Sequence, residues 1–485
     1  MMTNAEDLAR VEAALAEHPA VQSAAVRPGQ EGVTAYVVPK PAPVSVEPAS
    51  GQVSQWQSLW EQTYTQLPAS GDPTLNLSGW SSSYTGKPIR QDEMKDWVER
   101  TVERILALQP RRVLEIGCGM GLLLFRIAPR VESYHGVDFS PEALGYVHQN
   151  LAGLGLANVE LIQGTAEDLA PLQGAGPFDV AVINSVVQYF PDAGYLERVL
   201  AGLVDLLAPG GHIFIGDVRS FALLEAFHTS VQMLQADGDT PLPELRERID
   251  KLVREERELV IDPGFFTALR GRLPRIGRVE IQLKRGRYKN ELTRFRYDAV
   301  LHLDTGAAVE PERWLDWREA GLSVAALRST LAEEQPAALG VRGIPNARLA
   351  AEVRAVELLR SDKGGATVDD LLAAVRGVRG GIEPEDLWAL GKYLPYTVEL
   401  GWRGAAADGA YQAVFRHRDK AAGEGTEPVP EEEPSFHTNQ PVKEQAGRQL
   451  GAELRRFLSS RLPEELMPAS LEVVERLPAP HPPAP

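Results

Sequence analysis

Three glycines and two carboxylic acids stand where two neighbouring strands are expected to end. An apolar run leads into Glu115, and then Gly117, Gly119 and Gly121 allow a tight turn and the close approach of a ligand. The next apolar run ends at Asp138, 23 positions after Glu115, a spacing suited to a carboxylate that accepts hydrogen bonds from ribose hydroxyls. The pattern predicts a nucleoside site, although such glycines also mark ordinary turns. It lacks the Gly-Lys-Ser/Thr ending of a mononucleotide P-loop.

Polar groups also follow the next two predicted strands. Because these strands alternate with helical segments, we expect a mostly parallel sheet that binds ligands beyond its carboxyl edge. Cys118, inside the glycine loop, is expected to be a small packing residue beside the ligand. The further residues predicted to line the cofactor site are Phe139, Thr165, Ala166, Glu167, Asn184 and Ser185.

The bulk composition narrows the class of protein. The chain has 485 residues and a formal net charge of −17, which argues against a nucleic-acid partner. A single cysteine can form neither an internal disulfide nor a thiolate zinc site, so we expect a reducing cytoplasm and no metal. No apolar run is long enough to predict a membrane span or a signal peptide.

Composition shifts divide the chain into six parts. The central part predicts the sheet, with helices inserted between about 218 and 270, and an aromatic-rich segment before it is expected to cap the site. The predicted parts are 1–40, a helix with two strands; 41–110, a Pro-rich linker and the cap; 111–303, the sheet domain; 304–418, a small α/β region; 419–449, a linker; and 450–485, a helix with a strand.

The motif from Glu115 to Asp138 resembles the class I methyltransferase pattern, and this resemblance implies S-adenosylmethionine as the cofactor. More specifically, residues 52–303 resemble the N-methyltransferase domains embedded in adenylation domains of nonribosomal peptide synthetases, and 304–418 do so more loosely. The stretches that carry this resemblance are 53–56, 79–86, 184–191, 216–220, 262–266 and 289–297.

The flanks, 1–40 and 450–478, resemble the small carboxyl-terminal subdomain of an adenylation enzyme. The fold class implied is therefore α/β, a Rossmann-like class I methyltransferase sheet with a helical cap, flanked by two halves of that subdomain. The large adenylation core is absent and no Gly-Lys follows Pro478, so adenylation by this chain alone is not expected. The implied partners are an aminoacyl-phosphopantetheine carrier protein, an adenylation core and other synthetase domains.

The implied reaction is methylation of the α-amine of the carried aminoacyl group. Such an in-line displacement mainly requires alignment and a nucleophile that has lost its proton. Within the resemblance Glu291 is the predicted base, placed at a strand approach; the alternative is a surface carboxylate paired with Arg294 or Arg287. Asn184 is predicted to hold the methionine moiety or the substrate carbonyl.

Gln188 and Tyr189 are predicted to accept from or orient the amine, although Tyr189 and Phe190 can instead be a packing pair. Tyr84 is predicted to close over the cofactor, its alternative being a core aromatic. We expect Asp217 and Arg219 to form a structural ion pair, and His228 to be structural.

Two other functions share these motifs. One is O- or C-methylation of a natural-product intermediate, which calls for a His or Lys base near the cleft. The other is a non-catalytic insert that helps a partner to dock.

Overall fold

The computed structural model describes residues 5–29, 32–40, 47–65, 72–306, 310–311, 313–361, 363–402, 407–420, 438–474 and 476–478. The chain forms two compact units, one from Met1–Gln52 with Gln440–Pro485 and one from Val53–Asn439. In the described part of the chain, no helix combines the length and apolar character that crossing a membrane requires.

The small unit joins the two ends of the chain around one core. Strand β2 pairs antiparallel with β1 and parallel with β14, so a terminal segment completes a sheet begun more than 400 residues earlier. Val11 and Leu15 share a buried cluster with Leu454 and Leu458. The elements are α1 (Ala5–Ala16), β1 (Val21–Gly29), β2 (Gly32–Pro39), α15 (Pro441–Ser459), η4 (Glu464–Leu466) and β14 (Ser470–Val473). The predicted linker 419–449 is therefore too long, since α15 begins at Pro441; residues 421–437 of it lie outside the described residues.

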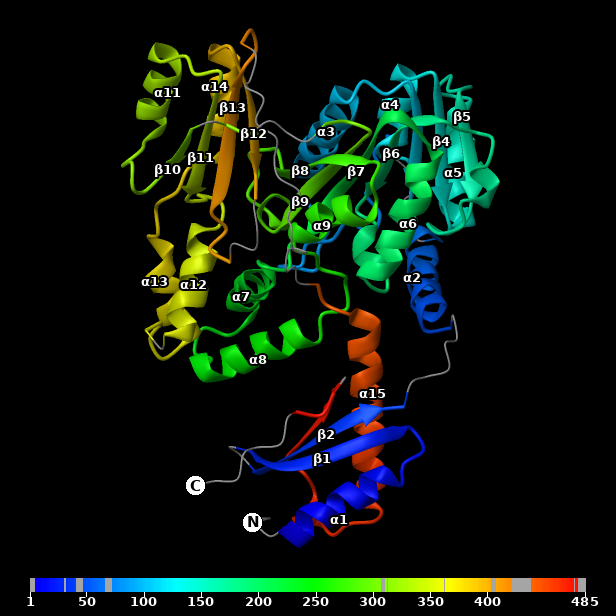
Figure 1. Cartoon of the computed structure of the whole chain (residues 1–485), viewed down its shortest axis with the longest axis vertical. Coiled ribbons are helices and arrows are strands. Elements are labelled where there is room, and N and C mark those ends of the chain that lie inside the picture. The colour runs from blue at the N-terminus through cyan, green and yellow to red at the C-terminus, as the bar shows by residue number, and fades with distance from the viewer. Residues whose placement is uncertain are drawn as a thin grey trace. The chain divides into compact units, whose positions relative to one another are not determined.

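The large unit is built on a seven-stranded sheet with the order β5-β4-β3-β6-β7-β9-β8 (Figure 1). The first five strands in that order are parallel, and β9 runs antiparallel to both β7 and β8. This sheet confirms the predicted Rossmann-like methyltransferase fold class. Its strands are β3 (Arg112–Ile116), β4 (Ser133–Asp138), β5 (Val159–Gln163), β6 (Phe178–Asn184), β7 (Leu207–Arg219), β8 (Ile276–Leu283) and β9 (Arg296–Leu303).

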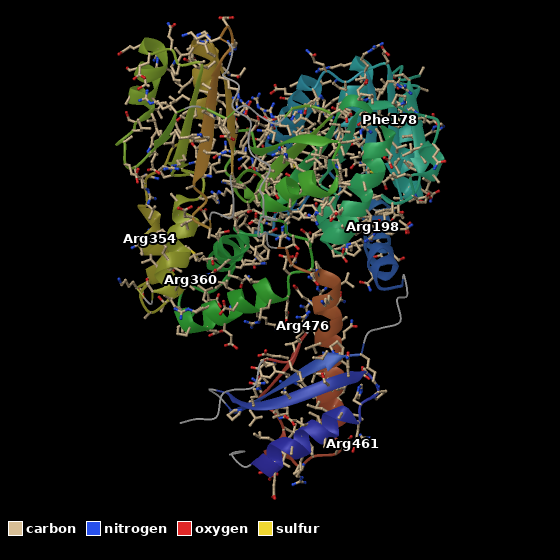
Figure 2. The ribbon with its side chains drawn as sticks, in the orientation of Figure 1. Phe178, Arg198, Arg354, Arg360, Arg461 and Arg476 are labelled. Atoms are coloured by element: carbon tan, nitrogen blue, oxygen red, sulfur yellow. The ribbon has the colours of Figure 1, made fainter. Side chains whose placement is uncertain are left out.

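Helices cover both faces of this sheet because its strands are apolar on both sides. Val180 and Val182 of β6 pack into a cluster with α3 (Gln91–Ala107), α4 (Leu124–Ile127) and α5 (Pro141–Leu151). Ala181 and Ile183, which alternate with them, pack on the other side with α6 (Ala193–Leu206) and α9 (Gly264–Arg272). The buried ring of Phe178, labelled in Figure 2, lies at the start of β6.

A second sheet, ordered β10-β11-β13-β12, belongs to the same compact unit. The predicted parts 111–303 and 304–418 are thus one body, for two reasons of packing. Helices α7 and α8 share a buried cluster with α12 and α13, and Leu283 of the first sheet shares one with Leu400 of the second. The elements are α7 (Leu224–Gln235), α8 (Leu242–Arg254), β10 (Trp314–Asp316), α11 (Val324–Glu333), β11 (Ala338–Ile344), α12 (Ala350–Arg360), α13 (Val368–Arg376), α14 (Pro384–Tyr393), β12 (Tyr396–Gly401) and β13 (Tyr411–His417).

Candidate functional site

A cavity of about 760 Å³ lies at the carboxyl ends of β3, β4 and β6 in the large unit. This is the edge at which open α/β sheets bind their ligands. Most of the predicted site residues line it, namely Glu115, Gly117, Cys118, Gly119, Asp138, Phe139, Thr165, Ala166, Asn184, Ser185, Gln188, Tyr189 and Glu291. Tyr84, Gly121 and Glu167 are not among its lining residues.

The glycine loop is bound to the end of β4. The amides of Gly117 and Cys118 both donate to the carbonyl of Val137, at 2.7 and 3.1 Å, and Gly117 has a φ of +75°. A Cβ at Gly117 would lie 2.4 Å from Cγ2 of Val186, so only glycine fits between the two strand ends. Gly121 differs from its prediction. A Cβ there would meet the ring of Phe125 at 2.7 Å, so this glycine serves the turn into α4.

Two buried acids follow β3 and β4. Oδ2 of Asp138 accepts from the Gly119 amide at 2.8 Å and Oδ1 from the Ser140 amide at 2.9 Å, yet burial still raises the pKa of Asp138. Glu115 accepts a hydrogen bond of 2.6 Å from the hydroxyl of Tyr134. Burial raises the pKa of Glu115 to about 8, so this carboxyl group is mostly protonated at neutral pH.

Cys118 is a buried thiol at the same edge. A Cβ at Gly136 would lie 3.1 Å from its sulfur, and burial raises the pKa of the thiol. A neutral, closely packed thiol agrees with the packing role expected for Cys118.

Two residues with amide side chains, at and just after the end of β6, belong to the cavity wall. Asn184 is the last residue of the strand, and Ser185 follows it with a φ of +57°. Within the part of the chain that the structure describes, the buried Oδ1 of Asn184 and the buried Oε1 of Gln188 have no hydrogen-bond partner. Both residues line the cavity. Buried acceptors of this kind are usually satisfied, so these two oxygens are acceptors that the described residues leave unused.

The expected ion pair between Asp217 and Arg219 is wrong. An extra residue in β7 opposite β9 and a φ of +65° at Asp217 turn these two side chains apart. Asp217 accepts from Arg296 at 2.6 Å and from Ser185 Oγ at 2.8 Å, and Lys284 Nζ lies 3.4 Å away. Burial alone would raise the pKa of Asp217, but Arg296 and Lys284 lower it below its ordinary value.

Arg219 instead belongs to a charged cluster in the cavity wall. It donates to Glu256 at 2.9 Å and to Glu258 at 2.8 Å, and Nε2 of His228 lies 3.1 Å from Oε2 of Glu256. All four residues line the cavity. Burial raises the pKa of Glu256, but His228 and Arg219 outweigh it and hold the pKa far below its usual range. Glu256 and Glu258 were not predicted to line the site. The sequence signal that could have indicated them is the charged run 254–258, which precedes the buried Leu259.

Glu291 is the first residue of the short helix α10 (Glu291–Arg294), which Asn290 caps, and not part of a strand approach. Its side chain is buried, and its oxygens accept from the Ser83 amide at 3.1 Å, Ser83 Oγ at 2.9 Å and Ser82 Oγ at 3.4 Å. The alternative of a surface carboxylate is therefore wrong. Arg294 pairs with Glu352 at 2.9 Å and Arg287 with Asp386 at 3.6 Å.

Tyr84 and Glu167 are held elsewhere. The hydroxyl of Tyr84 lies 3.0 Å from Ser230 Oγ of α7, and burial raises its pKa, so this tyrosine ties its loop to α7. Exposed Glu167 accepts a hydrogen bond of 2.7 Å from Arg198 of α6, which Figure 2 labels. Neither residue lines the cavity.

Tyr189 packs against the helix α2 (Glu47–Thr65) and not against its neighbour Phe190. Its ring centroid is 4.7 Å from that of Trp56 and 5.6 Å from that of Trp60. Phe190 pairs with Tyr195 at 4.8 Å. Burial raises the pKa of Tyr189, so its hydroxyl is a neutral hydrogen-bonding group in the cavity wall.

Comparison with known proteins agrees with this geometry. Residues 114–213 match the family model described as a methyltransferase domain. Chondramide synthase of Chondromyces crocatus is 41% identical over 97% of this chain, and beauvericin nonribosomal cyclodepsipeptide synthetase of Beauveria bassiana is 32% identical over 98% of it. The chain carries a methyltransferase domain and is similar over nearly its whole length to segments of these two proteins. It spans only 13% and 16% of the lengths of those two relatives.

Among solved structures, magnesium protoporphyrin IX methyltransferase of Synechocystis matches 54% of this chain and 100% of its own, at 12% identity and a TM-score of 0.33. That likeness is too weak to support any inference about this chain.

The cofactor of the methyltransferase domain is S-adenosylmethionine, which supplies an electrophilic methyl group on a sulfonium. The residues present fit it. Gly117 and Gly119 form a cradle that a Cβ would fill, and the Asp138 carboxylate can accept from ribose hydroxyls. Glu115 lines the same cavity, and its carboxyl group would offset the sulfonium charge once ionised. Among the residues that the structure describes, no cluster of His, Cys, Asp or Glu is arranged to hold a metal ion.

Proposed function

We propose that this domain methylates the α-amine of an aminoacyl group carried as a phosphopantetheine thioester. The observation that carries the proposal is the pair of buried, unpartnered amide oxygens of Asn184 and Gln188 in the cavity wall. A neutral primary amine has two N–H donors and one lone pair. Two acceptors can therefore hold both N–H groups while the lone pair is directed at the methyl group.

A hydroxyl nucleophile fits this pair of acceptors less well, because it has a single O–H donor. Leaving a buried acceptor unsatisfied costs about 1–3 kcal/mol. An α-amine also needs only a modest base, since its ordinary pKa is near 8. Glu291 remains our predicted base, and it lines the cavity.

The relatives support the choice of substrate and partners. One relative is named chondramide synthase and the other a nonribosomal cyclodepsipeptide synthetase. The partners proposed for this chain are accordingly an aminoacyl carrier protein, an adenylation core and the other synthetase domains. The small unit, which joins 5–39 with 441–473, matches the proposed role of an adenylation subdomain interrupted by the methyltransferase.

The test is transfer of labelled methyl from S-adenosylmethionine to a carrier loaded with a series of aminoacyl thioesters, followed by hydrolysis and mass analysis. A matched carrier bearing the α-hydroxyacyl thioester of the same side chain is the control. We expect an N-methyl amino acid and no transfer to the hydroxyacyl control. Transfer to the control alone, or to carbon, would overturn the proposal.

A second candidate, O- or C-methylation, is favoured by one observation. His228 lines the cavity and is hydrogen-bonded to Glu256, and a carboxylate-held imidazole is the kind of base that oxygen and carbon nucleophiles require. His228→Asn separates the candidates. With Glu291 as the base, amine methylation should be unchanged in this variant, whereas O- or C-methylation should be lost at every pH. A chain that binds no cofactor would leave only the docking insert.

A further inference from the structure

Three aromatic residues on α2 form a stripe that the reaction described so far does not use. Trp56, Trp60 and Tyr64 recur every four residues, so they lie on one face of the helix. All three line the cavity. Leu59, on another face of the same helix, is 50% exposed. We call these three residues the α2 stripe.

One end of the α2 stripe meets the cofactor loop. A Cβ at Gly119 would lie 3.3 Å from the hydroxyl oxygen of Tyr64. The amide of Gly119 in turn donates to Asp138 at 2.8 Å, and burial and then the charge of Asp138 raise the pKa of Tyr64. Tyr64 therefore covers the loop at the place proposed for the ribose.

The other end of the α2 stripe meets the acceptor side of the cavity. Trp56 and Trp60 both contact the ring of Tyr189, one position after Gln188. Trp60 is also fixed from behind, because a Cβ at Gly79 would lie 2.4 Å from its ring. The indole of Trp60 is thus held between Gly79 and Tyr189, in the middle of the stripe.

The α2 stripe thus runs from the glycine loop to the residues proposed to hold the methyl acceptor. A cofactor with its ribose at Asp138 and its methyl group directed toward Asn184 and Gln188 would have its sulfonium between the two ends of the α2 stripe. A sulfonium carries a full positive charge, and aromatic ring faces attract cations most strongly where water is excluded. The same cofactor without its methyl group is a neutral thioether, for which this attraction is lost.

We propose that the α2 stripe is the wall over the cofactor's sulfonium and that it selects the charged cofactor over the neutral product. The proposal rests on the proposed function for the use of S-adenosylmethionine and for the acceptor position beside Asn184 and Gln188, but not for the identity of the methylated atom. The wall favours S-adenosylmethionine before transfer and weakens its hold on S-adenosylhomocysteine afterwards. In this proposal the α2 stripe, and not Tyr84, covers the cofactor.

The test is calorimetric titration of the full chain with S-adenosylmethionine and, separately, with S-adenosylhomocysteine. Trp60→Leu keeps an apolar side chain but removes the ring. We expect it to weaken binding of the charged cofactor by about 10-fold and binding of the neutral product by no more than about 3-fold. Trp60→Phe should retain part of the preference. Leu59→Ala, the matched control on the same helix, should change neither affinity.

Equal losses for the two ligands in Trp60→Leu would overturn the inference and leave the stripe a packing surface, as would no loss for either. Circular dichroism of each variant, with Trp60→Phe as the conservative replacement, separates loss of the ring from loss of the fold. If the unaltered chain binds neither ligand, the proposed function itself fails. If it binds both and the variants do not discriminate, only this inference fails.

Discussion

Glu115 should release a proton when the cofactor binds. The group is buried at the end of β3 with a pKa of about 8, raised mainly by loss of solvation. A bound cation favours the charged form of a nearby carboxyl and lowers its pKa. Because the empty cavity then holds more protons than the occupied one, affinity for S-adenosylmethionine should rise with pH up to about 8 and level off above it.

The size of the effect follows from that pKa. At pH 7 a group with a pKa of about 8 is about 90% protonated, so a return to its ordinary value on binding releases about 0.9 proton. At pH 9 the release should fall to about 0.1 proton. The slope of the logarithm of affinity against pH equals the number of protons released. Near pH 7 the affinity should therefore rise close to tenfold per pH unit.

Calorimetric titrations in buffers of different ionisation enthalpy measure this number directly. Glu115→Gln is the matched control, because the amide keeps an oxygen that can accept from the Tyr134 hydroxyl and cannot titrate. The cofactor's own amino group titrates near pH 8, so the informative quantity is the difference between the two proteins. A difference near zero at pH 7 would refute the reasoning.

Two further predictions concern residues on which the site is built. Asp217→Asn should lower the free energy of unfolding by about 3–5 kcal/mol, because it removes the charge that Arg296 and Lys284 share. Asp304→Asn, which breaks an exposed ion pair with Arg275, should lower it by less than about 1 kcal/mol. Urea denaturation of the two variants measures both changes. Gly117→Ala should abolish cofactor binding by calorimetry, because its methyl group overlaps Val186, whereas Gly145→Ala, with open space around it, should bind normally.

The cofactor end of the site could be predicted because its residues act locally. The glycines and acids at the strand ends form the turn and contact the ligand themselves. Their spacing in the sequence is therefore enough to predict the cofactor site. Asp138 and Gly119 are joined by a hydrogen bond of 2.8 Å within one pair of neighbouring strands. The seven strands could likewise be predicted, since each is a short apolar run between turn signals.

At the acceptor end the sequence pointed to Asn184, Gln188, Tyr189 and Glu291, which line the cavity. Their contacts could not be predicted, because these join distant parts of the chain. Sequence spacing suggests that Asp217 faces Arg219, and only the bulge against β9 shows that it faces Arg296 instead. Glu291 meets Ser83 across 208 residues. The role given to Tyr84 depended on its polar loop, whereas the partner that decides its position, Ser230, lies on another element.

The distribution of charge in the cavity connects these two ends. Methyl transfer to an amine moves a positive charge from the sulfonium to the nitrogen. At the cofactor end Glu115 and Asp138 lie without a basic side chain hydrogen-bonded to them among the described residues, and burial raises both pKa values; this end therefore gains most from a cation. At the acceptor end Arg219 already neutralises much of Glu256 and Glu258. In the proposed reaction the new ammonium therefore gains less from this cluster than the sulfonium gains at the cofactor end. Its proton passes to Glu291, the proposed base, and a neutral methylated amine is left to depart.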